Sequence, residues 1–271
     1  MNKARVLVGV PIRQKKPILL EFLESLKRLE EKTYALDYLF IDDNDQKDSR
    51  ELLQSFAREN GEKCTLHIPD QDASQYVCNE RTHHWKDEMI WKVADFKDRI
   101  IQTARDQNFD YLFFIDSDIV LHPRTIDQLI QAKKEIISNI FWTKWLPDQI
   151  PLPQVWVSDH YTLFEHEIHE QLTNYEMGKR QQAFLERLKK PGIYEVGGLG
   201  ACTLIARSAL QKEISFKRIR NVTFWGEDRH FCIRAAALGL KLFVDTHYPA
   251  YHIYRDSDLA GIEEFKKNAK A

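Results

Sequence analysis

Tyr111-Leu112-Phe113-Phe114-Ile115-Asp116-Ser117-Asp118-Ile119-Val120 is the stretch that decides the fold, because an apolar run ends there in two acids separated by a serine. The run is short and rich in aromatic residues, which is typical of a buried strand. A helical pattern resumes only after His122-Pro123, so the acids lie where the strand meets a loop. In open α/β sheets, ligands bind at this edge.

The two carboxylates of this motif repel each other unless a positive charge lies between them. A divalent metal ion is the simplest candidate, since hard oxygen ligands suit Mg²⁺ or Mn²⁺. The alternative is an acidic turn in which Asp118 is only solvated, because isolated motifs of this length match often by chance. The surrounding sequence has to decide between the two.

Composition is that of an ordinary globular protein: 271 residues, 43% hydrophobic, 30% charged, with a formal net charge of −2. The near-neutral charge disfavours nucleic acid as a partner. No transmembrane segment or signal peptide is recognisable. The four cysteines contain no CxxC pair, which favours reduced thiols and a cytoplasmic location.

Alternating strand and helix patterns fill the N-terminal half and predict parallel βαβ units. The predicted strands cover residues 5–11, 36–41, 64–68, 111–115, 136–142, 154–157, 194–196, 202–206, 242–245 and 250–254. The predicted helices cover residues 17–31, 49–59, 85–107, 125–134, 161–190 and 228–238, and the tail after Phe265 is expected to fray. The predicted fold class is α/β: a Rossmann-like, mostly parallel sheet flanked by helices, with a mixed C-terminal region.

Three acidic features lie at predicted strand ends or helix starts: Asp42-Asp43, Asp116-Ser117-Asp118 and Glu227-Asp228. Helix capping alone could explain the last pair, since carboxylates are favoured at helix N-termini. His252, on the last predicted strand, adds a further metal-ligand type to the set.

The order of these motifs resembles that of the GT-A glycosyltransferases, particularly the family 2-like members. The resemblance covers most of the chain. The matching stretches are Val8–Pro11, Leu39–Asn44, Phe114–Asp118, the Gly-Gly-x-Gly-Ala-x-x-Leu-x-x-Arg stretch from Gly197 to Arg207, Trp225–Asp228 and His252. Each motif is weak alone, but their joint order is specific.

The resemblance implies a nucleotide site. Pro11, Ile12 and Arg13 would hold the nucleotide. Asp43 would accept a hydrogen bond from the base, and Lys92 is a weaker candidate whose alternative is an exposed helix lysine.

The resemblance also implies a metal site. Asp116 and Ser117 would contact the nucleotide, while Asp116, Asp118 and His252 would hold Mn²⁺ or Mg²⁺.

The resemblance further implies which residues act in catalysis and acceptor binding, and which parts of the chain bind each substrate. Asp228, with Glu227 beside it, would act as general base on the acceptor hydroxyl, and Trp225 and Gly198 would contact acceptor or sugar. A retaining enzyme would instead use Asp228 to orient the acceptor. Residues 1–271 would form one catalytic domain: about 1–122 for the nucleotide, about 123–260 for the acceptor, and a tail at 261–271.

The implied function is a metal-dependent transfer of a sugar, a hexose in our expectation, from a nucleoside-diphosphate sugar donor to a hydroxyl of a carbohydrate or other acceptor. Two alternatives remain. Asp116 would be the nucleophile of a haloacid-dehalogenase-like phosphatase or phosphotransferase, or the chain would be a non-catalytic nucleotide-sugar-binding module. Basic residues around 179–190 leave peripheral membrane contact open. The sequence does not set the donor, the acceptor, the stereochemical outcome or the oligomeric state.

Overall fold

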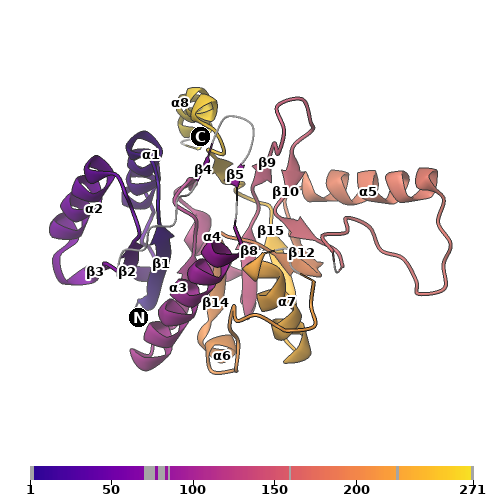
Figure 1. Cartoon of the computed structure of the whole chain (residues 1–271), viewed down its shortest axis with the longest axis horizontal. Coiled ribbons are helices and arrows are strands. Elements are labelled where there is room, and N and C mark those ends of the chain that lie inside the picture. Colours follow the sequence, from indigo (N-terminus) through magenta and orange to yellow (C-terminus); the bar gives the residue numbers. More distant parts are fainter. Residues whose placement is uncertain are drawn as a thin grey trace.

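The computed structural model describes residues 3–69, 77–78, 83–84, 86–158, 160–223 and 226–269. The central sheet of the described residues has eight strands, which lie side by side in the order β12-β15-β8-β14-β6-β1-β2-β3 (Figure 1). Its strands are β1 (Ala4–Ile12), β2 (Tyr34–Asp42), β3 (Cys64–His67), β6 (Tyr111–Phe114), β8 (Ile136–Asn139), β12 (Ile193–Val196), β14 (Thr203–Ala206) and β15 (Leu242–Asp245).

Short strands form two-stranded pairs outside this sheet: β4 (Val77–Cys78) with β5 (His83–His84), β7 (Ile119–Val120) with β16 (Tyr251–His252), β9 (Trp142–Thr143) with β10 (Leu152–Pro153), and β11 (Val155–Trp156) with β13 (Gly198–Leu199). The helices are α1 (Lys16–Lys27), α2 (Lys47–Asn60), α3 (Asp87–Asp106), α4 (Thr125–Gln131), α5 (Asn174–Leu188), α6 (Arg207–Leu210), α7 (Glu227–Ala237) and α8 (Ile262–Asn268), with 3₁₀ turns η1 (Gly61–Lys63) and η2 (Asp256–Gly261).

The sheet is parallel in the half formed by β3, β2, β1 and β6 and mixed beyond it. Strands β3, β2, β1 and β6 run parallel to one another, whereas β14 is antiparallel to both β6 and β8. Strand β15 is parallel to β8, and β12 closes the edge antiparallel to β15. The predicted fold class is confirmed. Because β14 is reversed, its N-terminal end meets the C-terminal ends of β1, β2 and β6 at one edge.

Strand β1 is buried on both faces, which explains its continuous apolar sequence. Val6, Val8 and Val10 pack in the cluster that includes residues of α1, α2 and α4, while Leu7 packs in the cluster that includes residues of α3 and α7. Gly9 permits close packing on the second face, because a Cβ there would lie 2.3 Å from Ile100 Cγ2 of α3. The approach of α3 to the sheet therefore depends on this missing side chain.

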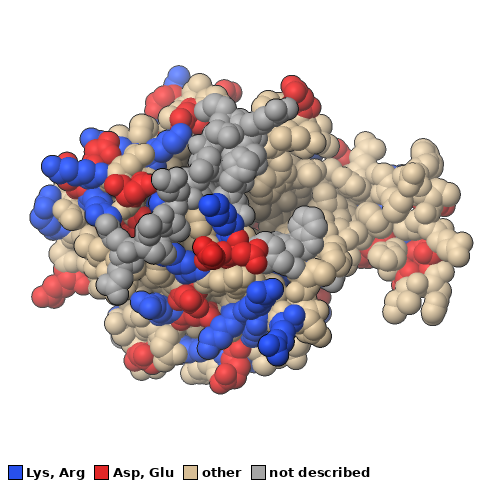
Figure 2. All heavy atoms as spheres, in the orientation of Figure 1, with Lys and Arg blue, Asp and Glu red and all other residues tan. Residues whose placement is uncertain are grey.

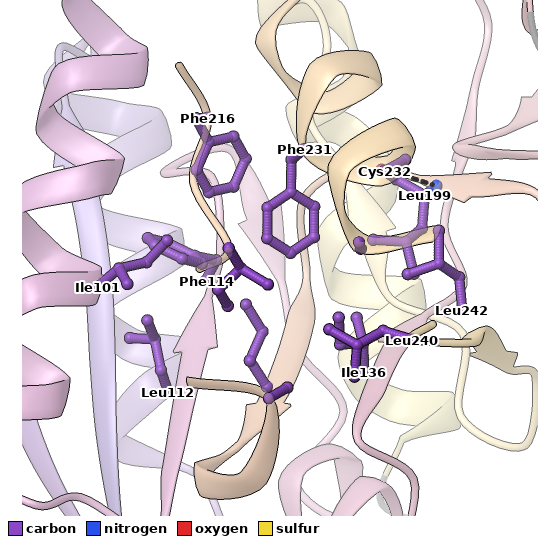
Figure 3. Packing of buried hydrophobic residues seen from close by; sticks show 14 of the residues in the cluster. Ile101, Leu112, Phe114, Ile136, Leu199, Phe216, Phe231, Cys232, Leu240 and Leu242 are labelled. Atoms are coloured by element: carbon purple, nitrogen blue, oxygen red, sulfur yellow. Dashed lines mark hydrogen bonds between the residues drawn. The ribbon is translucent and has the colours of Figure 1, made fainter. Parts of the chain in front are cut away.

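Aromatic packing joins α7 to the same face of the sheet (Figure 3). Phe231 of α7 stacks on Phe216 with ring centroids 4.6 Å apart, and Phe216 meets Phe114 of β6 edge to face. Cys232 accepts a hydrogen bond from Leu199 N, which ties α7 to β13. These contacts fix the start of α7 relative to the strand that leads into the acidic motif.

Three predicted elements are wrong in detail. The predicted helix at 161–190 forms only as α5, whose start is set by a capping box between Thr173 and Glu176. In the preceding residues, Tyr161 and Leu163 pack against the core outside a helix, whereas Ile168 is 91% exposed, so packing does not support a helix there. Figure 1 shows α5 projecting beyond the sheet.

The other two differences lie near the C-terminal end. The predicted strand at 250–254 does not join the main sheet, because Tyr251 and His252 pair with β7 instead. Of the tail after Phe265, which is expected to fray, residues 266–268 form the end of α8; this helix buries Ile262 and is held by ion pairs from Lys266. No helix in the described part of the chain is long and apolar enough to cross a membrane.

Candidate active site

A cavity of 1050 Å³ lies at the edge where β1, β2 and β6 end. The surface in Figure 2 is hollowed between the charged face formed by α1 to α3 and the less charged part that carries β9, β10 and α5. Nine of the residues singled out in the sequence line the cavity: Pro11, Ile12, Arg13, Asp43, Asp116, Ser117, Asp118, Glu227 and Asp228. A smaller cavity of 490 Å³, over β1 to β3, is lined by none of them.

Asp43 lies at the end of β2 and is held by two cations. Lys92 Nζ of α3 lies 2.7 Å from Asp43 Oδ1, and Arg13 Nη1 lies 3.7 Å from Asp43 Oδ2. Lys92 is therefore not an exposed helix lysine, since its side chain is only 17% exposed. Asp42 turns inward and accepts hydrogen bonds from the backbone and side chain of Asn44. Asp43 is thus the acid of this pair that faces the cavity.

The pairing of β7 with β16 brings His252 to the acidic motif. His252 lies opposite Ile119, and Ile253 N donates a hydrogen bond to Asp118 O. His252 Nε2 lies 3.6 Å from Asp118 Oδ1, which exceeds hydrogen-bond length. The separation suits two ligands of one ion, since Mg²⁺ and Mn²⁺ favour carboxylate oxygen and imidazole also binds such metals.

The predicted three-residue metal set is not gathered in full. Among the residues that the structure describes, no three His, Cys, Asp or Glu side chains are placed to hold an ion by themselves. A Mg²⁺-type site commonly uses one or two carboxylates and completes its shell with water and substrate phosphates. Asp118 and His252 fit that pattern, and Asp116 lies on the same loop at the cavity.

A hydrogen-bonded chain orients His252 from behind. Thr143 Oγ1 lies 2.8 Å from His252 Nδ1 and accepts a hydrogen bond of 2.8 Å from Gln154 Nε2. Thr143 is fully buried, and Phe141 packs edge to face on the imidazole ring. The second ring nitrogen is therefore directed at Asp118.

Glu227 and Asp228 begin α7, where the helix dipole favours carboxylates. The preceding Gly226 has φ +102°, a conformation that glycine adopts readily. Lys97 of α3 reaches both acids: its Nζ lies 2.7 Å from Glu227 Oε1 and 2.9 Å from Asp228 Oδ1. Lys97 is only 4% exposed, and its ammonium lies 4.8 Å from the centroid of the Phe216 ring.

The charges at the cavity floor perturb one another. Burial among protein atoms raises the pKa of Asp116 to about 7, and the negative charge of Asp118 acts in the same direction, whereas Lys97 opposes it. The Asp116 side chain nevertheless keeps exposed surface that faces the cavity. Burial likewise raises the pKa of Asp228 to about 6, against the opposing charge of Lys97.

The same cluster acts on Lys97. Burial disfavours its charge, yet the neighbouring Asp228, Glu227 and Asp116 together hold the pKa of Lys97 well above the usual range. The lysine therefore remains protonated at neutral pH. The positive charge of Lys97 thus interacts with three carboxylates at once.

An aromatic wall stands beside Asp228. Trp156 and Tyr161 line the cavity with ring centroids 4.5 Å apart, and burial raises the pKa of the Tyr161 hydroxyl. Gly198 does not line the cavity; its missing side chain makes room for Trp156, whose ring a Cβ would meet at 1.9 Å. Gly200 does line it, and a Cβ there would lie 3.5 Å from Asp228 Oδ2. Trp225 lies outside the described residues.

Sequence reasoning missed Lys97, Thr143 and Tyr161. A signal for Lys97 was available: it follows Val93 by four residues and precedes Ile100 by three, so it lies on the apolar face of α3. Lysine is rarely buried without a partner, so that position indicates an acidic contact. No comparable pattern marks Thr143, because its partners come from distant parts of the chain.

Comparison with known proteins places the N-terminal half of the chain in a family. The model described as glycosyltransferase family 25, N-terminal domain, matches residues 3–146. A protein of Anopheles gambiae named glycosyltransferase 25 family member is 25% identical over 138 residues, which are 49% of this chain and 23% of that protein. The match thus spans less than a quarter of its length.

Solved structures share the fold at low identity. GalNAc-T7 with UDP, GalNAc and Mn²⁺ superposes with a TM-score of 0.56 at 12% identity, over 92% of this chain and 43% of that chain. The mannosyltransferase PcManGT from Pyrobaculum calidifontis, in complex with GDP-Man and Mn²⁺, gives 0.55 at 11% identity, over 100% and 63%. Residues 1–349 of S. aureus TarS give 0.54 at 11% identity, over 92% and 60%.

The expected resemblance to GT-A glycosyltransferases is confirmed by the sheet and by these superpositions. The family model covers more than half of the residues and includes β1, β2 and the acidic motif after β6. The chain therefore belongs to the glycosyltransferase family 25 N-terminal domain family and has the GT-A fold.

Proposed function

We propose that this protein is a metal-dependent glycosyltransferase that moves a sugar from a nucleoside-diphosphate sugar to an acceptor hydroxyl. The observation that carries the proposal is the convergence on one cavity of Asp43, Asp118 and Asp228, from three separate parts of the chain. Each lies at an element end on the edge of the sheet where α/β proteins bind ligands.

The donor side of the cavity holds the nucleotide in this proposal. Pro11, Ile12 and Arg13 follow β1, and Asp43 accepts a hydrogen bond from the base while Lys92 fixes its other side. Asp116 and Ser117 contact the nucleotide, and Asp118 and His252 hold Mn²⁺ or Mg²⁺. When bound, such an ion neutralises the charge that develops on the departing diphosphate.

The acceptor side supplies the base. Asp228 accepts the proton of the acceptor hydroxyl, a role worth about 10²–10⁴-fold in rate. Trp156 and Tyr161 offer apolar ring faces beside it, which suit the apolar face of a sugar ring. Residues of about 1–122 serve the donor and those of about 123–260 the acceptor.

Two further points belong to the proposal. The transferred sugar is a hexose, which is supported by the GalNAc and GDP-Man in two structures of the same fold, and the Mn²⁺ in both supports a divalent metal ion, Mn²⁺ or Mg²⁺, in this protein. The protein works in the cytoplasm, which is supported by three cysteines, Cys64, Cys202 and Cys232, that are free thiols.

The test is incubation of the protein with a panel of nucleotide sugars, with Mn²⁺, Mg²⁺ or EDTA, while nucleoside diphosphate release is measured. We expect metal-dependent release with at least one donor. Asp228→Asn should retain donor binding, measured by calorimetry, and lose release by about 10²-fold or more. Asp118→Ala should lose the metal-dependent part of donor binding.

The alternatives give different results. Release of inorganic phosphate from sugar phosphates, abolished by Asp116→Asn, would favour a phosphatase that uses Asp116 as nucleophile. Metal-dependent nucleotide-sugar binding without release, across acceptor panels, would favour a non-catalytic module. Absence of any nucleotide binding would overturn both the transferase and the module.

A further inference from the structure

We propose that Lys97 is the positioning residue of the general base: its ammonium holds Asp228 Oδ1 and leaves Oδ2 for the acceptor hydroxyl. This inference rests on the proposed function of Asp228. It assigns a role to a residue that the transfer mechanism described above does not use. Lys97 itself lies beneath the two acids and is not among the residues lining the cavity.

The geometry separates the two oxygens of Asp228. Oδ1 lies 2.9 Å from Lys97 Nζ, a charge-assisted contact of ordinary length. Oδ2 is directed toward Gly200, since a Cβ on that glycine would lie 3.5 Å from it. Gly200 lines the cavity, so Oδ2 is the oxygen beside the space that an acceptor can enter.

The lysine itself is held rigidly. Its stem comes from the buried face of α3, which is packed on β1 where Gly9 meets Ile100. Its ammonium lies against the Phe216 ring and pairs with Glu227 as well as Asp228. A lysine only 4% exposed has few other rotamers, so it transmits the position of α3 to the start of α7.

Glu227 has a complementary part in this arrangement. Glu227 Oε1 also lies 2.7 Å from Lys97 Nζ, so the charge of Lys97 is divided between Glu227 and Asp228. The charge of Glu227 raises the pKa of Asp228, and that of Lys97 lowers it. The titratable side chains that act electrostatically with Asp228 are Lys97, Glu227, Asp116, Tyr161 and Cys232. Lys97 and Glu227 therefore shift the pKa of Asp228 in opposite directions.

The experiment measures kcat, donor KM and the pH profile of kcat for Lys97→Met and Glu227→Gln, with the full chain and Mn²⁺. We expect Lys97→Met to lower kcat by roughly 10²-fold, as for misplacement of a reacting group by about 1 Å, with donor KM unchanged. Its acid limb should move to higher pH. Glu227→Gln should move the acid limb to lower pH, because a repelling charge is removed. Lys97→Arg should recover part of kcat.

A matched control is Lys266→Met. Lys266 also bridges two carboxylates, Glu21 and Glu263, each at 2.8 Å, but on α8 and away from the cavity. The Lys266→Met variant should leave kcat and the pH profile unchanged. Opposite shifts of the acid limb in Lys97→Met and Glu227→Gln support the proposal, because a purely structural lysine would alter stability alone.

Other outcomes overturn it. A normal kcat and acid limb in folded Lys97→Met, even with a lower melting temperature, would reduce Lys97 to a structural ion pair. If Lys97→Met does not fold, Glu227→Gln decides alone, and an unmoved acid limb overturns the proposal. Full activity of Asp228→Asn would instead overturn the proposed base. Those two failures are therefore distinguishable.

Discussion

His252 Nε2 faces Asp118 Oδ1 at 3.6 Å across the β7–β16 pair, with Thr143 bound to the opposite nitrogen of the same imidazole ring. The arrangement combines two ligand types with a buried hydroxyl that fixes the ring. Groups behind a metal ligand commonly set its orientation and basicity.

Metal affinity should therefore depend on the residue behind the ligand. Thr143→Val should weaken Mn²⁺ binding by about 10–100-fold, because it removes the hydrogen bond to His252 Nδ1 and keeps the shape. His252→Ala should weaken it at least as much. Titration of Mn²⁺ by electron paramagnetic resonance, in the presence of nucleoside diphosphate, measures this without turnover. Equal affinity of Thr143→Val and the unaltered protein would contradict the assigned orientation.

Turnover should fall on the acid side of neutrality. The base must be ionised to accept a proton, and burial raises the pKa of Asp228 to about 6. A raised pKa means that the carboxylate takes up its proton at higher pH than a solvated aspartate. The rate of nucleoside diphosphate release, at saturating donor, Mn²⁺ and acceptor, should decline as pH falls through about 6. A flat profile down to pH 4.5 would contradict this role.

The sequence predicted which acids gather at the edge of the sheet, but not all of the residues that hold them in place. Asp43 and Asp118 each follow an apolar strand of the parallel half, so the common edge of those strands brings them together. Thr143 acts through contacts between distant segments, which no local pattern encodes, whereas the position of Lys97 on the apolar face of α3 indicates an acidic contact but not which acids provide it. The predicted helix at 161–190 had a favourable composition, but Tyr161 and Leu163 pack against the core outside a helix, and packing rather than propensity decided the outcome.

The close approach of α3 to β1 should be sensitive to one methyl group. Gly9→Ala would place a Cβ 2.3 Å from Ile100 Cγ2, and overpacking of this kind costs about 1–3 kcal/mol of unfolding free energy. Gly178→Ala is the control, since it lies within α5 with open space around it and should be stabilising by about 0.5–1 kcal/mol. Urea unfolding followed by circular dichroism measures both. A neutral Gly9→Ala would show that α3 can shift freely.

The two glycines near Trp156 should respond differently. Gly198→Ala forces a Cβ into the Trp156 ring at 1.9 Å and should lower the melting temperature. Gly200→Ala makes only ordinary contacts, the shortest 3.5 Å, so the fold should hold while the added methyl narrows the space beside Asp228 Oδ2. We expect Gly200→Ala to raise the acceptor KM or lower kcat with an unchanged melting temperature. Differential scanning fluorimetry and acceptor saturation curves separate the two effects.

The β7–β16 pair affects the stage of synthesis at which Asp118 and His252 can come together. Asp118 emerges during synthesis well before His252, and the strand that carries His252 pairs only after most of the sheet has been made. The proposed pair of ion ligands is therefore incomplete in a partly synthesised chain. If Asp118 and His252 hold the ion as proposed, metal loading becomes a late event of biogenesis, because an incomplete chain that already holds β1, β2 and β6 cannot bind the ion through both ligands.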